Sequence, residues 1–286
     1  SGDDVVAGDA QAISSAGHAT SQATNDAGDD SSAGGEAGND TILSGGYDSE
    51  YGSGDLLAGD SMALGATATA YGDNTAGEGG EAGDDSIVSG EGHDTISGGA
   101  LASAAGAALA DQDNDAWFGG SAGNDTIDAD RGTNGDYGDE VAGDAMARSE
   151  SAHAQANSTN DAVGNASAGN DTIDAGEGDN ALAGDAMAVS GATATADVDN
   201  TASNSGSAGD DVIYAGDDND TISGGSQARA TGDASASTDN LATGNNASAG
   251  NDDIYAYEGS DVIAGDAQAL SSGANASAYG TNTAGD

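Results

Sequence analysis

Small apolar residues alternate with polar ones over long stretches of this chain. Within 184–202, Ala194 and Ala196 share one parity, whereas Thr193 and Thr195 occupy the other. A period of two is typical of β-strands, because successive side chains of a strand point to opposite faces. In a helix the same spacing would scatter the alanines around the surface, although Ala has the highest helix propensity. The pattern therefore favours strands with one face of small residues.

This pattern belongs to a repeat of about forty residues, which is marked by the segment A-G-[ND]-D-x-I. The segment begins at Ala37, Ala82, Ala122, Ala168, Ala208 and Ala249. We predict one continuous β-solenoid over 1–286, with a partial repeat at 1–36 and full repeats at 37–81, 82–121, 122–167, 168–207, 208–248 and 249–286. Two longer repeats carry insertions at 47–53 and 132–137, which we expect to be surface loops.

Each repeat contains two acidic turns of the form G-x-D-x-[IVL]. In uninterrupted repeats the second turn follows nine residues after the first, as Asp94 follows Asp85. The segment from Gly90 to Gly99, G-E-G-H-D-T-I-S-G-G, resembles the RTX (repeats-in-toxin) nonapeptide G-G-x-G-x-D-x-U-x, where U is a large aliphatic residue. The resemblance implies a parallel β-roll whose turns hold calcium and whose strands point one large aliphatic residue inward. It also implies a bacterial protein exported by type I secretion that folds when it meets calcium outside the cell.

Composition changes this picture in two ways. Aromatic residues make up only 3% of the chain and Ala supplies much of its apolar content, so the expected core is thin and Ala-rich. The fold class predicted is therefore all-β, a parallel β-solenoid or β-roll with calcium-binding Gly-Asp turns. With 51 acidic residues against 3 basic ones, the formal charge is -48. Such a chain lacks the cationic side chains that bind nucleic acid, and no apolar run is long enough to insert into a membrane.

The turn aspartates are the candidate metal ligands. In a solenoid, equivalent residues of adjacent coils lie about 4.8 Å apart, so their carboxylates repel one another unless a cation lies between them. Ca²⁺ binds six to eight oxygen ligands and suits carboxylates with glycine-rich turn carbonyls. We expect several Ca²⁺ ions, with ligands from Asp4, Asp40, Asp55, Asp85, Asp94, Asp125, Asp139, Asp171, Asp211, Asp220, Asp252 and Asp261.

Some acidic positions have a plainer interpretation. Asp and Gly form turns without any metal, so the turn aspartates could serve only as turn formers and solubilising groups. This interpretation is favoured for the G-D pairs at Asp9, Asp60, Asp144, Asp185 and Asp266, and for D-N pairs such as Asp73 with Asn74 and Asp199 with Asn200. These residues are expected to be turn residues, and at most second-rank ligands.

No catalytic constellation is visible in the sequence. His18, His93 and His153 fall at different phases of different repeats, and no G-x-S-x-G elbow occurs. We expect no enzymatic activity and no small-molecule substrate. The favoured hypothesis is a secreted, calcium-dependent structural protein of a filament, surface layer or stalk, at the cell surface or beyond, whose open coil ends associate end to end or laterally. The alternatives are a spacer of an RTX adhesin, an ice-binding solenoid and the repeat region of a secreted hydrolase.

Overall fold

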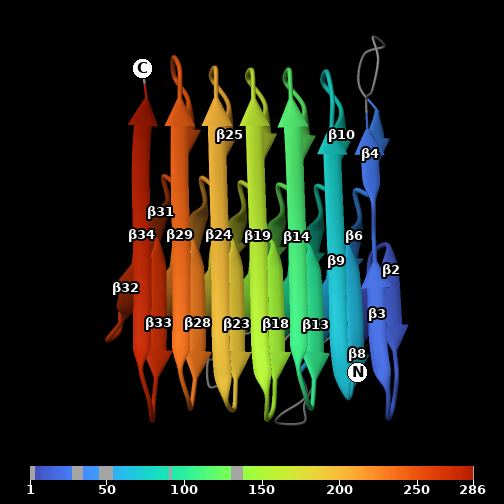
Figure 1. Ribbon diagram of the computed structural model, residues 1–286, viewed down its shortest axis with the longest axis vertical. Helices are drawn as coiled ribbons and strands as arrows, with labels where there is room; N and C mark the ends of the chain where they lie inside the picture. Colours follow the sequence, from blue (N-terminus) through green and yellow to red (C-terminus); the bar gives the residue numbers. More distant parts are fainter. Residues whose placement is uncertain (1–3, 28–34, 45–53, 90–91, 130–137, 286) are drawn as a thin grey trace.

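The chain winds into stacked coils of parallel strands. The computed structural model describes residues 4–27, 35–44, 54–89, 92–129 and 138–285, and no helix occurs among them. Both predicted insertions, 47–53 and 132–137, lie outside the described residues. Every strand pairs with the equivalent strand one repeat away, so that Ala68 lies opposite Ala108. Figure 1 shows the coils side by side in sequence order, from blue to red. The predicted all-β parallel solenoid is confirmed, and each repeat forms one wide coil.

Two sheets of short strands follow the acidic turns. The β6 sheet contains β6 (Thr41–Leu43), β11 (Ser86–Val88), β16 (Thr126–Asp128), β21 (Thr172–Asp174), β26 (Val212–Gly216) and β31 (Asp253–Ala256). The β1 sheet contains β1 (Val5–Ala7), β7 (Leu56–Ala58), β12 (Thr95–Ser97), β17 (Glu140–Ala142), β22 (Ala181–Ala183), β27 (Thr221–Ser223) and β32 (Val262–Ala264). These strands carry the large aliphatic residue that each turn motif places two positions after its Asp.

Two sheets are built from the Ala-rich half of the repeat. The β2 sheet contains β2 (Ala10–Ile13), β8 (Ser61–Gly65), β13 (Ala100–Ala104), β18 (Ala145–Ser149), β23 (Ala186–Ser190), β28 (Ser226–Ala230) and β33 (Ala267–Ser271). The β3 sheet contains β3 (His18–Gln22), β9 (Thr67–Ala76), β14 (Ala108–Trp117), β19 (His153–Val163), β24 (Thr193–Ser203), β29 (Ala234–Thr243) and β34 (Ala276–Gly285), and β4 (Asn25–Ala27) also pairs with β9.

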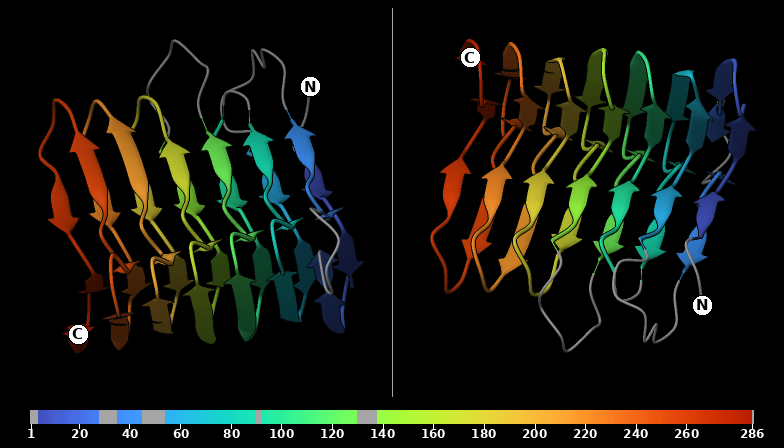
Figure 2. Two further views of the ribbon diagram at one scale, coloured as in Figure 1. Left: turned by 90° about the horizontal axis from the view of Figure 1, so that it is seen from above. Right: turned by 90° about the horizontal axis from the view of Figure 1, so that it is seen from below.

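The fifth sheet closes each coil with two-residue strands. This β5 sheet contains β5 (Glu36–Ala37), β10 (Glu81–Ala82), β15 (Ser121–Ala122), β20 (Ser167–Ala168), β25 (Ser207–Ala208) and β30 (Ser248–Ala249). The two views of Figure 2 show successive coils adding along one direction, with the two ends of the chain at opposite ends of the stack. The described residues contain no helix that is long and apolar enough to cross a membrane.

The core is thick in one part of the coil and thin in the other. Between the β6 and β1 sheets, aliphatic ladders such as Ile87, Ile127 and Ile173 pack against Ile96 and Leu182. Between the β2 and β3 sheets the buried apolar residues are almost all alanine, as the low aromatic content predicts. The β2 sheet also buries its reverse face, where Met62, Leu101, Met146 and Met187 pack against alanines of the β1 sheet. This second buried face was not predicted from the alternation.

Candidate metal centre

Six of the predicted ligands form a first aspartate row, in which each residue directly precedes a strand of the β6 sheet. The row consists of Asp40, Asp85, Asp125, Asp171, Asp211 and Asp252. From Asp85 onward, each carboxylate Oδ1 accepts the backbone N–H of the Asp one coil earlier. The N–O distance is 2.7 Å from Asp85 to Asp125 and 2.8 Å from Asp171 to Asp211. The stacked strands thus bring residues about forty positions apart into one continuous line.

The other six predicted ligands form a second row before the β1 sheet. It consists of Asp4, Asp55, Asp94, Asp139, Asp220 and Asp261, with Asn180 in the fifth coil. The same backbone-to-Oδ1 bond links its members, at 2.8 Å from Asp55 to Asp94 and 2.7 Å from Asp94 to Asp139. Asn180 continues the line, because its Oδ1 accepts the N–H of Asp139 at 2.9 Å. Every predicted ligand therefore lies in one of two rows.

The remaining carboxylate oxygens of these rows provide a test for a bound cation. Among the described residues, six row members have a buried Oδ2 with no hydrogen-bond donor, namely Asp40, Asp85, Asp94, Asp171, Asp211 and Asp220. An ionised carboxylate only accepts, so such an atom needs either a proton or a cation. Glycine carbonyls lie beside the first row, and oxygen ligands of this kind suit Ca²⁺. The residues therefore fit calcium, and the carboxylates of the two rows would hold it.

A third aspartate row lies before the β2 sheet. It contains Asp9, Asp60, Asp144, Asp185 and Asp266, which the sequence presented as ordinary turn residues. They do occupy turns, but Asp60, Asp144 and Asp185 are completely buried. In the third and sixth coils Gly99 and Gly225 take this position. The plain turn interpretation missed the burial, because a G-D pair looks the same whether its carboxylate points outward or inward.

A ladder of buried asparagine amides supports the third row. Asn74, Asn114, Asn160 and Asn200 each donate an Nδ2–H to the Oδ1 of the next coil's Asn, at 3.0–3.1 Å. Asn160 also donates to Asp144 Oδ2 at 3.0 Å and to Asp185 Oδ1 at 2.8 Å. The expectation that the D-N pairs form turns was wrong, because these residues lie inside the long β3-sheet strands.

Burial and mutual repulsion raise the pKa values of the row carboxyls. Burial, followed by the charge of Asp60, raises the pKa of Asp85 to about 9. Burial raises the pKa of Asp60 to about 7, and burial together with the charge of Asp144 raises the pKa of Asp171 well above its usual range. At neutral pH these groups therefore favour their protonated form unless a cation replaces the proton.

The fold and the site together define a parallel β-solenoid of acidic-turn repeats. Comparison with protein families specifies the class further: the RTX calcium-binding nonapeptide repeat matches in four copies, at 80–100, 160–186, 205–228 and 246–269. Each match spans one turn of the first row and one of the second. The chain therefore carries RTX calcium-binding repeats, and these repeats bind several calcium ions. No curated protein and no solved structure matched.

Proposed function

We propose that this chain is a structural element whose solenoid is ordered by calcium, with the first and second aspartate rows as ligands. One observation supports this proposal most strongly. Several aspartates of the two rows have a buried Oδ2 atom that accepts no hydrogen bond, while their Oδ1 atom accepts a backbone N–H. Five row members, Asp85, Asp94, Asp171, Asp211 and Asp220, thus have one oxygen that joins them to the preceding coil and one that is available for an ion. Binding and folding are then a single coupled event.

Ionised carboxylates repel one another along each row. Two carboxylates about 4.8 Å apart repel by about 3.5 kcal/mol at an effective dielectric constant of 20. A few such pairs equal the whole net stability of a domain, about 5–15 kcal/mol. Calcium between the coils converts that repulsion into attraction. Rigidity along the solenoid axis therefore depends on the ion, which suits a mechanical role and requires no catalytic group.

The proposed place of action is outside a bacterial cell, as part of a filament, surface layer or stalk. RTX repeats are typical of secreted bacterial proteins, and their β-roll is not typically catalytic. Extracellular calcium modules bind with Kd values of about 10⁻⁴–10⁻³ M. Sites of that strength remain empty in the cytosol and fill after export, so the chain would leave the cell unfolded and become rigid outside it.

We propose that the solenoids associate with one another, end to end or laterally. The strands at the edge of a coil carry backbone N–H and C=O groups that a parallel coil of the same kind can pair.

Negative-stain electron microscopy and sedimentation of the purified chain test this function. With calcium, filaments or sheets should form without any partner, and chelator should disperse them. Rods that remain monomeric at all calcium concentrations would contradict self-assembly and favour the adhesin-spacer role. Particles whose shape and sedimentation ignore calcium would contradict the structural role of the ion itself.

A further inference from the structure

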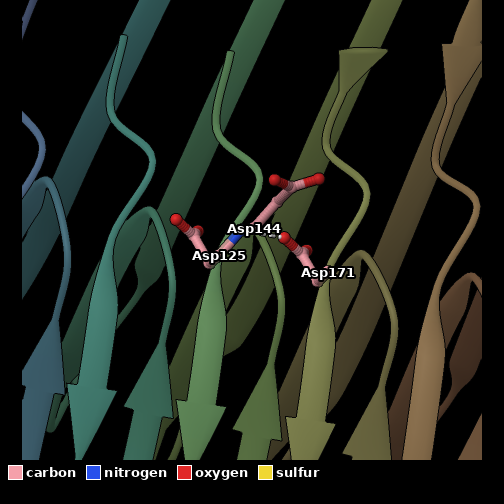
Figure 3. A group of neighbouring side chains, drawn as sticks. All are labelled: Asp125, Asp144 and Asp171. Atoms are coloured by element: carbon pink, nitrogen blue, oxygen red, sulfur yellow. Dashed lines mark hydrogen bonds between the residues drawn. The ribbon is translucent and has the colours of Figure 1, made fainter. Parts of the chain in front are cut away.

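Carboxylates of the first and third rows meet inside the solenoid. Asp125 precedes β16, Asp171 precedes β21 and Asp144 precedes β18, and one oxygen from each lies within 4.8 Å of the others. Figure 3 shows Asp144 reaching between the other two from the opposite turn. Asp125, Asp171 and Asp144 are 2%, 1% and 0% exposed, respectively. The sequence repeat thus encloses three acidic groups in a space that excludes solvent.

A backbone carbonyl oxygen also lies beside this cluster. Asp171 Oδ2 is buried and has no hydrogen-bond donor. A Cβ atom at Gly143 would lie 1.9 Å from Asp171 Oδ2 and 1.9 Å from the carbonyl oxygen of Gly184. The absent side chain of Gly143 therefore lets a backbone carbonyl oxygen approach the unpartnered carboxylate oxygen beside the cluster.

Hydrogen bonds hold Asp144 in place without exhausting its oxygens. Asn114 Nδ2 donates to Asp144 Oδ1 at 2.7 Å, and Ser158 Oγ and Asn160 Nδ2 donate to Oδ2 at 2.6 Å and 3.0 Å. Donors of this kind favour the charged form of a carboxylate. Oδ2 accepts two of these hydrogen bonds, but Oδ1 accepts only one and keeps a lone pair for an ion. The amide ladder therefore orients Asp144 as a ligand does, rather than neutralising it.

The arrangement recurs along the solenoid. At Gly184 a Cβ atom would lie 2.0 Å from the unpartnered Asp211 Oδ2 and 1.8 Å from the Gly224 carbonyl oxygen. In the third coil, where Gly99 replaces the third-row Asp, Gln112 Oε1 would lie 2.4 Å from a Cβ atom at Gly99, and this oxygen also lacks a donor. In the third coil, a side-chain amide oxygen without a hydrogen-bond donor thus lies where the third-row carboxylate lies in other coils.

We propose that Asp144, together with Asp125 and Asp171, binds a dehydrated Ca²⁺ ion inside the solenoid, and that Asp60 and Asp185 do the same beside Asp85 and Asp211. Asp144 lies outside the segments that match the RTX repeat, so the repeat model does not assign it. The proposal rests on the calcium-dependent folding proposed above and adds the third-row aspartates as ligands of the first-row ions, because both rows would share the unpartnered Oδ2 atoms of the first row. An ion enclosed in this way leaves only when the coil opens, whereas an ion at an exposed turn, such as that of Asp4, exchanges faster.

The test compares Asp144→Asn with Asp199→Asn in the full chain, because Asp199 is an exposed residue of β24 and its substitution removes the same charge. Bound calcium is counted by equilibrium dialysis at neutral pH, and release into a chelator is followed by stopped flow. Asp144→Asn should lose about one ion per chain, or bind it at least about tenfold more weakly, since even outer-shell changes cost 10–100-fold in affinity. Asp199→Asn should match the wild type.

Several outcomes would overturn this inference. Unchanged stoichiometry and release in Asp144→Asn, with a wild type that still needs calcium to fold, contradicts the inner site while leaving the proposed function intact. A wild type that folds without calcium contradicts both. If Asp144→Asn does not fold, the wild-type release kinetics decide: a slow phase of at least one ion supports the enclosed site, and release of every ion in one fast phase refutes it.

Discussion

At the scale of single residues, positive-φ glycines and buried amides position the acidic turns. The glycine of each A-G-[ND]-D segment has a positive φ, +57° at Gly169, and lies against the asparagine ladder. A Cβ atom at Gly169 would lie 2.2 Å from Asn160 Oδ1. Glycine is required there for two reasons, since an L-residue would be strained by the backbone conformation and would also displace the amide.

Replacing Gly169 with Ala separates these two effects when it is compared with Gly79→Ala. Gly79 has φ +67° but nothing within 4 Å of its Cβ position. Gly79→Ala should cost about 1–2 kcal/mol, from the left-handed backbone alone. Gly169→Ala should cost about 1–3 kcal/mol more, because it also overpacks the ladder. Urea unfolding of the calcium-saturated variants measures both, and equal losses would show that the ladder does not constrain this turn.

Single residues also show which parts of the candidate site could be predicted from the sequence. The two rows of G-x-D-x-[IVL] aspartates were predictable, because an Asp and an aliphatic residue at fixed spacing recur together. Asn200 was mistaken for a turn residue, although it shares its parity with the buried Ala194 and Ala196. If the same alternation is continued to Asn200, it predicts that the Asn200 amide is buried inside the coil. The burial of Asp144 had no such signal, since only the facing turn reveals it.

At the scale of elements, stability comes from ladders that run across coils. Ile127 in β16 is 1% exposed and lies in register with Ile87 and Ile173. A strand of three residues contributes one such side chain, so the strand is stable only because its neighbours stack above and below it. Period and spacing predicted these strands well. They did not predict the bend at each G-D turn, which buries Met187 on the second face of the β2 sheet.

The ladder predicts a large difference between Ile127→Ala and Ile13→Ala. Ile127→Ala removes buried methyl groups and leaves a cavity, which costs about 2–5 kcal/mol. Ile13 is 64% exposed, so the same change there should stay within about 0.5 kcal/mol. Denaturant midpoints of the calcium-saturated proteins provide the comparison. Similar losses at the two positions would mean that the stacked aliphatic residues do not form the core.

At the scale of the whole molecule, charge dominates. The formal charge of -48 opposes compaction, and the folded chain buries many of the carboxylates that carry it. The pKa values of Asp144, Asp60 and Asp85 rise to about 6, about 7 and about 9 in the folded state, mainly because burial penalises the charged form. The folded state therefore binds protons more tightly than the unfolded chain, whose carboxyls titrate near 3.8.

The pH dependence of the calcium-free protein follows from that difference. Protonation of these groups stabilises the fold fully below about pH 4, and the stabilisation is lost as the pH rises through about 6 to 9. Without calcium, the chain should gain β-structure on acidification and lose it toward alkaline pH, as measured by far-ultraviolet circular dichroism. Order that instead increases between pH 5 and 9 would contradict the raised pKa values.

With calcium the dependence reverses, because protons compete with the ion for the same oxygens. The most direct test of the account is therefore a calcium titration of the metal-free chain near neutral pH, followed by circular dichroism and then by chelation. We predict a cooperative gain of β-structure that chelator reverses and that equal concentrations of Mg²⁺ do not produce, since Mg²⁺ holds its waters and prefers a tight octahedral shell. A spectrum and a urea midpoint that are the same with calcium as with chelator would contradict it.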